Sequence, residues 1–367
     1  MRHLLIRQFS ELCLHVAEGR EEQAWRNLES NGPIDLEALS ARAEEHRVTN
    51  LLAGVLNEAS ANLRNKTQTP SSVVKTPVHH LSQSLMLKGQ ILELDRALKG
   101  KKSNVVLLKG AIQLFEPLYP QQGMRRMADI DILVDDVGPF EALVSLGYRN
   151  REGVADPTIP KLPIGEHHYP PLLREKDLAT VELHKVAVSP MYSRIVPEGF
   201  MQDSVEIEGC SNVKIPSPRH YLAHTLVHCL KHDRDTLDGG LLLRGLVECE
   251  LLFARLNDED VEAVRKHFFD QKSGKLWEAW RALSDWAFRS DDKAFYRSVP
   301  AFLLILEFRI RATGYRSVFL IAFFNRLASV VTPKYWTSGK GVRANRLVMT
   351  GDFWGRLYSK FLRALSR

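Results

Sequence analysis

Asp129 and Asp131 are the residues whose types and spacing most directly suggest chemistry. They lie two positions apart in the apolar run DIDILV, which follows a glycine and paired arginines in GMRRMADIDILV. In a β-strand, residues i and i+2 share a face, so both carboxylates point one way while Ile130, Ile132 and Val134 point into the core. Two convergent carboxylates at a strand start offer Mg²⁺ hard oxygen ligands and leave room for substrate phosphates. The pattern predicts a site for metal-dependent phosphoryl or nucleotidyl transfer, although aspartate is also common at the entrance of an ordinary strand.

The segments on either side supply further polar candidates. Upstream, an apolar strand predicted over VVLL runs into Lys109-Gly110 and a short amphipathic helix. Downstream, the alternating segment TVELHKVAV predicts a strand that places Glu182 and His184 on one face. Lys109 is either a surface lysine in a turn or a ligand-binding residue, since ligands in open α/β sheets gather beyond the carboxyl ends of strands. His184 is either structural or a group that orients a carboxylate.

With these elements the chain resembles the uncharacterised bacterial nucleotidyltransferases of the DNA polymerase beta-like superfamily. Their pattern runs LLKG, Tyr-Pro, Arg-x-x-x-Asp-hydrophobic-Asp-hydrophobic-hydrophobic-Val, Gly-Tyr and acidic-hydrophobic-His. The corresponding elements here are LLKG at 107–110, YP at 119–120, RRMADIDILV at 125–134, GY at 147–148 and ELH at 182–184. The shared order and spacing make the resemblance fairly specific.

The resemblance implies transfer of a nucleoside monophosphate from an NTP to an acceptor, with release of pyrophosphate and with Mg²⁺ or Mn²⁺ as the cofactor. It assigns Asp129, Asp131 and Glu182 as catalytic residues and metal ligands. The nucleotide-binding residues that it implies are Lys109, Gly110, Gly123 and Arg125. The base of the nucleotide stays open, and so does the acceptor, which is a small molecule, a peptide, a protein or an RNA.

The chain departs from the wider superfamily at one position. That superfamily places Gly-Ser shortly before its carboxylates to bind triphosphate, whereas Gly123 is followed here by Met124. Lys109 and Arg125 can supply compensating charge, Arg125 as a bidentate partner for phosphate, while Arg126 is expected on the solvent side. The missing serine favours a rival interpretation, a catalytically silent module that binds nucleotide or a partner. The retained carboxylates oppose it.

Two patterns in the C-terminal half add supporting candidates. His220, His224, His228 and His232 recur every four residues in PSPRHYLAHTLVHCLKH. Histidines at i and i+4 can chelate zinc, but HExxH is absent and four histidines on one stripe cannot reach one ion. We interpret them as a helix face lining an interface or pocket. Members of the resembled family carry such a helix followed by an Arg-x-x-x-acidic helix.

In this chain the second pattern runs from Arg244 to Glu248, two residues that can pair with each other at i, i+4. The alternative is that His228 or Arg244 faces the nucleotide, which makes both, with His184, candidates for supporting roles. His167 and His168 lie in a long loop rich in proline and glycine. They either contact the acceptor or the base, or merely decorate the loop.

The amino-acid composition limits the class of protein to which the chain can belong. The 367 residues are 44% hydrophobic and 26% charged, which is ordinary for a soluble globular protein of two or three domains. A net charge of +6 suits an anionic substrate but does not establish nucleic-acid binding. Four cysteines without CxxC spacing predict reduced thiols and a cytoplasmic location. The apolar stretch SVFLIAFF is too short to span a bilayer, so no integral membrane segment is expected.

The order of the predicted elements gives the fold class, a mixed α+β protein. We expect an N-terminal helical region over 1–100, a small nucleotidyltransferase-like mixed sheet over 101–195 and a C-terminal helical domain over 196–367. One long helix is predicted from about 79 to 98. The tail carries arginines among bulky apolar residues, which indicates either a helical subdomain or, as a third functional interpretation, contact with an anionic membrane surface. These arginines are Arg309, Arg311, Arg316 and Arg326.

Overall fold

A mixed five-stranded sheet carries the segments that the sequence singles out. The computed structural model describes residues 2–30, 36–54, 77–101, 103–150, 162, 167–232, 243–298 and 305. The sheet order is β3-β2-β1-β5-β4, with β1–β2 and β4–β5 antiparallel and β1–β5 and β2–β3 parallel. The strands are β1 (Val105–Leu107), β2 (Asp129–Val134), β3 (Thr180–His184), β4 (Val205–Glu206) and β5 (Val213–Ile215).

Helices flank this sheet, which confirms the predicted mixed fold class. The α-helices are α1 (Arg2–Ala17), α2 (Glu21–Ser30), α3 (Leu36–Glu45), α5 (Pro77–Ala97), α6 (Gly138–Ser145), α7 (Pro218–Val227), α8 (Leu243–Arg255), α9 (Asp258–Asp270) and α10 (Gly274–Phe288). Shorter elements are the 3-10 helices η1 (Lys109–Leu114), η2 (Ser193–Ile195) and η5 (Asp292–Tyr296), and the π-helical η3 (His228–His232).

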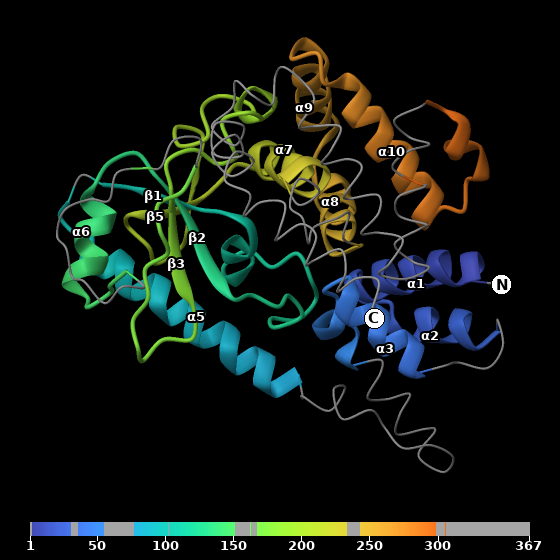
Figure 1. Cartoon of the computed structure of the whole chain (residues 1–367), viewed down its shortest axis with the longest axis horizontal. Coiled ribbons are helices and arrows are strands. Elements are labelled where there is room, and N and C mark those ends of the chain that lie inside the picture. The colour runs from blue at the N-terminus through green and yellow to red at the C-terminus, as the bar shows by residue number, and fades with distance from the viewer. Residues whose placement is uncertain are drawn as a thin grey trace, which may run out of the picture.

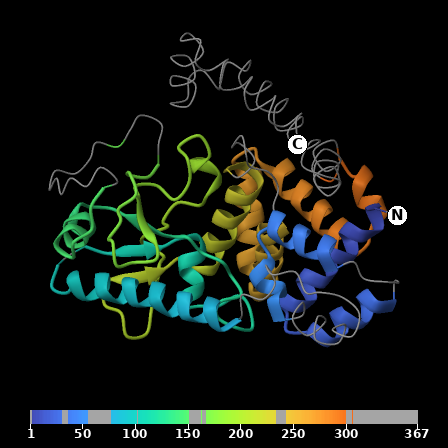
Figure 2. The same cartoon turned by 60° about the horizontal axis from the view of Figure 1, so that its bottom comes forward.

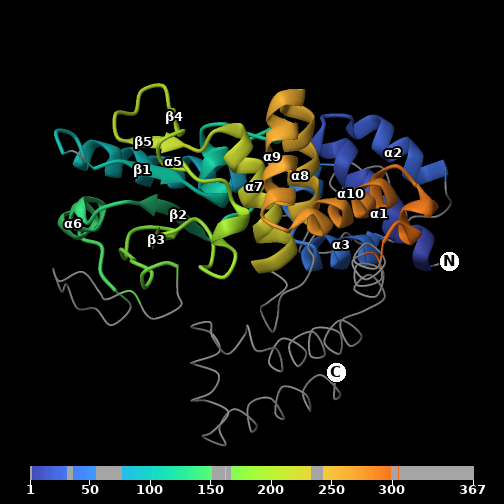
Figure 3. The ribbon, with the colours of Figure 1, turned by 90° about the horizontal axis from the view of Figure 1, so that it is seen from above.

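The N-terminal and C-terminal helices gather on the same side of the sheet. Figures 1 and 3 show the strands with α5 and α6 at one end, α1–α3 with α10 at the other, and α7 and α8 between them. Helix α1 packs against both α8 and α10, although these segments lie at opposite ends of the described sequence. The two helical regions therefore form one helical body beside the sheet, and one continuous hydrophobic core joins them to it.

Helix α5 holds the sheet in place, and Figure 2 shows it running alongside the strands. Its side chains Leu87, Ile91 and Leu94 recur at helical spacing and are all buried, so this stripe of the helix packs on the core. The buried Asp95 carboxylate accepts hydrogen bonds from the backbone N–H groups of Asn212 and Val213 at 2.7 and 3.0 Å. These bonds fix the start of β5, so α5 belongs structurally to the sheet.

The structure refines the expected boundaries. The helix predicted from about 79 to 98 is α5, and the strands predicted around VVLL, DIDILV and ELH are β1, β2 and β3. Strands β4 and β5 lie beyond residue 195, so the sheet extends into the segment expected to be only helical. The loop around 151–161 and the tail arginines lie outside the described residues. Among the helices that are described, none is long and apolar enough to cross a membrane.

Candidate active site

The parallel pairing of β2 with β3 brings two predicted carboxylates together. In this register Asp131 is the partner of Glu182, and both side chains lie on the same face of the sheet. Ligand atoms of Asp131, Glu182 and His184 all lie within 4.8 Å of one another. We call these three residues the carboxylate cluster. Within the described part of the chain, it is the group of acidic, histidine or cysteine side chains arranged to hold a metal ion.

Asp129 lies at the edge of this cluster. It is half-buried at the first position of β2, where its register partner is Thr180, and it is not one of the three residues whose ligand atoms converge. Its charge nevertheless acts on Lys109 together with the charges of Asp131 and Glu182. The structure thus brings all three predicted carboxylates around one lysine, with Asp131 and Glu182 closest to each other.

Lys109 joins β1 to η1 and turns its ammonium toward the cluster. Its Nζ donates a hydrogen bond to Asp131 Oδ1 at 2.7 Å. Its backbone has a φ of +49°, a left-handed conformation that a non-glycine residue adopts only when its surroundings impose it. Burial acts to lower the pKa of Lys109, but Asp131, Asp129 and Glu182 raise it overall. Lys109 is therefore a charged counter-ion to the carboxylates.

His184 orients Asp131 from the neighbouring strand. Its Nε2 lies 2.8 Å from Asp131 Oδ1, and both side chains are almost completely buried. Burial lowers the pKa of His184 to about 4 in spite of the adjacent carboxylate, so the ring is neutral near pH 7 and Nε2–H is the donor. The rings of His167 and His168 both pack 5.2 Å from the His184 ring. The two loop histidines therefore lie next to the carboxylate cluster and not far from it.

The cluster carries more negative charge than the chain itself neutralises. Burial and the neighbouring Asp131 raise the pKa of Glu182, whereas Lys109 and His184 outweigh the effect of burial on Asp131 and hold its pKa below the ordinary value. A Mg²⁺ ion with ligands at about 2.1 Å would hold two opposite oxygens about 4.2 Å apart. This distance is slightly less than the 4.8 Å within which the ligand atoms of the cluster lie. The carboxylates of Asp131 and Glu182 thus fit a divalent cation after a small contraction and the withdrawal of Lys109, while His184 stays the hydrogen-bond donor of Asp131.

A small pocket lies beside the carboxylate cluster, and we call it the α7–α8 pocket. Its cavity volume is about 50 Å³. Lys109, Arg125, His224, Thr225, His228, Arg244 and Glu248 all line it. Four of the residues that the sequence proposed for nucleotide contact or support, Lys109, Arg125, His228 and Arg244, therefore meet in one place, although they come from distant segments of the chain.

Glu248 organises the arginines of this pocket. Arg125 Nε donates a hydrogen bond to Glu248 Oε1 at 2.8 Å, while Arg244 Nε lies 4.0 Å from the same oxygen. Burial acts to lower the pKa of Arg125, but Glu248 and the nearby tyrosines Tyr119 and Tyr221 raise it overall. Arg125 is thus a fixed buried cation, and the i, i+4 pair expected between Arg244 and Glu248 is the longer of the two contacts. Arg126 is exposed, as expected, and pairs with Glu44.

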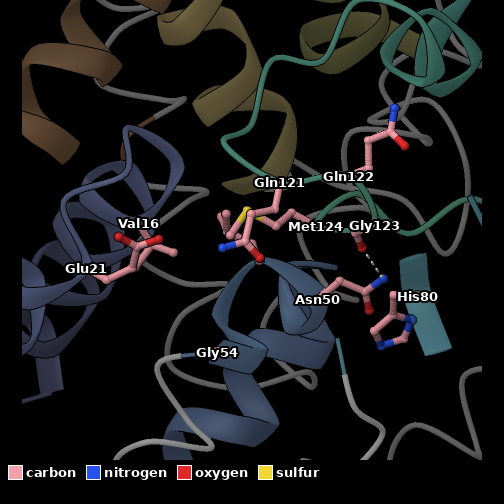
Figure 4. A pocket seen from close by; sticks show the side chains of 10 residues that line it. Val16, Glu21, Asn50, Gly54, His80, Gln121, Gln122, Gly123 and Met124 are labelled. Carbon is pink, nitrogen blue, oxygen red and sulfur yellow. Dashed lines mark hydrogen bonds between the residues drawn. The ribbon is translucent and has the colours of Figure 1, made fainter. Parts of the chain in front are cut away.

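The two glycines assigned to nucleotide binding have packing roles in this structure. A Cβ added at Gly110 would lie 2.1 Å from the Arg125 guanidinium, so glycine lets that arginine cover the turn. Gly123 has a φ of +92° and an added Cβ would lie 2.8 Å from the backbone of His80. Figure 4 shows Gly123 with Asn50, whose Nδ2 donates to the Gly123 carbonyl at 3.1 Å. Gly123 and Asn50 line a separate cavity of about 370 Å³ between the N-terminal helices and α5.

The histidines of α7 make packing contacts, and two of the series, His224 and His228, line the α7–α8 pocket. His220 contacts Ser217 Oγ at 2.7 Å and the Glu198 carbonyl at 2.8 Å, and His224 Nε2 contacts the Ala187 carbonyl at 3.1 Å. His228 lines the α7–α8 pocket at the start of the π-helical turn. None of these histidines belongs to the metal-compatible group found in the described residues. The side chain of His232 lies outside the described residues.

Comparison with known families supports the resemblance read from the motifs. A family described as uncharacterised nucleotidyltransferase matches residues 32–272, which include every residue of the cluster and the α7–α8 pocket. The chain belongs to this nucleotidyltransferase family. No curated protein and no solved structure matches the chain.

Within this member of the family, local sequence patterns do not reveal two features of the site. The sequence offers Glu248 only as a partner of Arg244, because its ion pair with Arg125 spans 123 positions that no local pattern connects. The sequence also presents His224 only as one member of a helix stripe, although it is the member that lies fully buried beside the site. The four-residue spacing did place His224 and His228 on one face, which was the available signal.

Proposed function

We propose that this protein transfers a nucleoside monophosphate from an NTP to an acceptor, releases pyrophosphate and depends on Mg²⁺ or Mn²⁺. The observation that carries the proposal is the β2–β3 register, which sets Asp131 beside Glu182 in a nucleotidyltransferase family. Two buried acidic groups at this spacing, with one lysine as counter-ion, have the charge that a divalent cation requires. The separation of Asp129 from the tightest group makes it an outer ligand in this proposal.

Asp131 and Glu182 would hold the cation, with Asp129 completing the acidic edge. The bound ion would activate the acceptor and stabilise charge on the leaving phosphate. His184 donates to Asp131 and so keeps that carboxylate in one orientation, as residues behind metal ligands commonly do. Lys109 would exchange its contact with Asp131 for a contact with substrate phosphate.

The cations that line the α7–α8 pocket would contact the phosphates. The pocket presents three cations, Lys109, Arg125 and Arg244, against the single carboxylate of Glu248. This excess of positive charge adjoins the carboxylate cluster. The pocket cations would therefore hold phosphate oxygens of the nucleotide, and the reacting phosphorus would sit between the pocket and the cluster. Fixed guanidinium groups would replace the serine hydroxyl that Met124 cannot supply. Lys109 and Arg125 keep the nucleotide-binding roles expected from the sequence, and Arg244 joins them.

A catalytically silent module is the second candidate, and one contact favours it. Asp131 Oδ1 already accepts hydrogen bonds from Lys109 and His184, so Lys109 stands where a cation would be needed. A protein in which this ion pair is permanent would bind nucleotide through the α7–α8 pocket without chemistry. Cytoplasmic location remains a prediction under either candidate. It agrees with the four free thiols.

Incubation with each of the four α-labelled NTPs and Mg²⁺ or Mn²⁺ separates the two candidates. The acceptors to be supplied are small-molecule, peptide, protein and RNA fractions of a cell extract. We expect pyrophosphate release and a labelled product with at least one NTP, and loss of both with EDTA. Tight NTP binding without pyrophosphate release under all of these conditions would establish the silent module instead.

A further inference from the structure

One buried atom in the α7–α8 pocket has no role in the proposed function. His224 is only 1% exposed, and its Nδ1 has no hydrogen-bond partner among the described residues. A buried polar atom without a partner costs free energy, and its residue lines a cavity from which a bound group would supply the missing partner. Of the described residues that line this pocket, His224 is the one with such an atom.

The other ring nitrogen fixes what Nδ1 can bind. Nε2 lies 3.1 Å from the Ala187 carbonyl oxygen, which can only accept, so Nε2 carries the hydrogen. Burial, together with His228, Lys109 and His184, lowers the pKa of His224, which keeps the ring neutral. Nδ1 therefore offers a lone pair and needs a hydrogen-bond donor. A fully ionised phosphate oxygen has no hydrogen to give.

The other residues that line the pocket narrow the class of group that it can bind. Thr225 Oγ1 donates its hydrogen to the Tyr221 carbonyl at 2.9 Å, so toward other groups this hydroxyl also acts as an acceptor. The cations Lys109 and Arg244 line the same cavity of about 50 Å³. The pocket thus combines donors for an anion with acceptors for a hydroxyl, and it is too small for a whole nucleotide. A ribose hydroxyl, attached to the sugar that carries the phosphates, meets both requirements.

We propose that His224 Nδ1 accepts a hydrogen bond from a ribose hydroxyl of the bound nucleotide, so that this pocket distinguishes ribonucleotides from deoxyribonucleotides. The inference rests on the proposed function, since it requires a nucleotide with its phosphates at Lys109 and Arg244. A buried acceptor left unpaired by a deoxyribose would lose a hydrogen bond without regaining one from bulk water, which weakens binding by about tenfold or more.

Binding of the wild-type protein tests this without any substitution. ATP, GTP, CTP and UTP are titrated with Mg²⁺ by calorimetry, followed by the 2′-deoxy and 3′-deoxy forms of the tightest binder. We expect at least one deoxy form to bind about tenfold more weakly or worse. Equal affinities for all three sugars would overturn the inference and leave a buried water as the partner of Nδ1, while nucleotide binding itself would stand. If none of the four NTPs binds, the proposed function and this inference both fail.

Two variants of His224 separate recognition from packing. His224→Gln can keep a donor near the Ala187 carbonyl but moves the acceptor, whereas His224→Asn keeps an acceptor near the Nδ1 position and loses the Ala187 contact. We expect His224→Gln to bind the ribo and deoxy forms alike and His224→Asn to retain the discrimination at a lower melting temperature. Wild-type discrimination in a folded His224→Gln protein would contradict the assignment, because His224 would then serve only to hold the segment at Ala187.

Discussion

Two groups of charged residues in the described part of the chain both contain ion pairs but differ in the balance of positive and negative charges. In the first, which we call the Arg174 cluster, Arg174 and Lys176 face Glu93 and Asp177. Arg174 donates to Asp177 Oδ2 at 2.7 Å and to the Leu146 carbonyl at 3.0 Å. The hydrogen bond from Arg174 lowers the pKa of Glu93. Burial acts to raise the pKa of Asp177, but hydrogen bonds from Arg174 and Tyr148 and the nearby positive charges together lower it overall.

The site around Lys109 has no such balance. One ammonium faces Asp129, Asp131 and Glu182, while the neighbouring His184 is neutral near pH 7. Here one carboxyl, that of Glu182, has its pKa raised by burial and by Asp131. The comparison teaches that an ion pair alone does not mark a functional site. A buried group of charges without enough partners does mark a functional site. Such a group destabilises the folded protein unless a further cation binds to it, so its presence points to a function.

The largest expected effect is the loss of turnover when the excess charge is removed. The double substitution Asp129→Asn and Asp131→Asn should lower the transfer rate by about 10³-fold or more, since the cation would lose the Asp131 carboxylate and the outer carboxylate of Asp129. The fold should persist because both asparagines keep the shape of the strand. Asp177→Asn is the matched control from the Arg174 cluster and should leave turnover per folded molecule unchanged. Normal turnover in the double variant would reject the transferase mechanism.

Glu182 distinguishes chemistry from binding. Glu182→Gln should retain binding of Mg²⁺-NTP, because Asp131 and the pocket cations remain, but should reduce kcat by about 100-fold through the loss of a charged ligand. Measured KM values should change little. The control is Glu93→Gln, which removes a carboxylate from the balanced cluster. Equal kcat values for the two variants would mean that Glu182 is an ordinary charge of the sheet.

Breaking the balanced cluster should affect stability alone. Arg174→Met leaves the half-buried Asp177 carboxylate without its main partner, so the free energy of unfolding should fall by about 1 to 2 kcal/mol, as measured by urea denaturation. Because the folded-state pKa values of Asp177 and Glu93 are lowered, this stabilisation is present at neutral pH and fades as the pH falls below about 4. The difference between wild type and variant should therefore narrow in acid, and a gap that widens in acid would refute this account of the cluster.

The smallest effect concerns phosphate recognition. Lys109→Ala and Arg125→Ala should each weaken binding of ATP by about tenfold while leaving the weaker binding of adenosine almost unchanged, since both side chains are proposed to contact phosphate. Arg126→Ala is the neighbouring control, and its exposed side chain should matter less. Calorimetric titrations showing equal losses for ATP and adenosine would remove Lys109 and Arg125 from the phosphate site.

The sequence predicted those features that local patterns encode. Alternation in DIDILV and ELH located β2 and β3, and the helix predicted from about 79 to 98 matches α5 within two residues at each end. Strands β4 and β5 are only two and three residues long, too short for a periodic signal. The pairing of Arg125 with Glu248 and the contact of Lys109 with Asp131 arise from tertiary packing. For that reason the charge balance, which sets the site apart, could not be read from spacing.

Diffraction from crystals soaked with Mn²⁺ and a non-hydrolysable NTP analogue tests the central claim most directly. The account predicts an anomalous peak about 2.2 Å from carboxylate oxygens of Asp131 and Glu182. Lys109 Nζ should have moved from Asp131 to a phosphate, and no peak should appear at the balanced Arg174 cluster, which serves as an internal control. The account is contradicted if the nucleotide is bound but Lys109 still holds Asp131 and no manganese lies between Asp131 and Glu182.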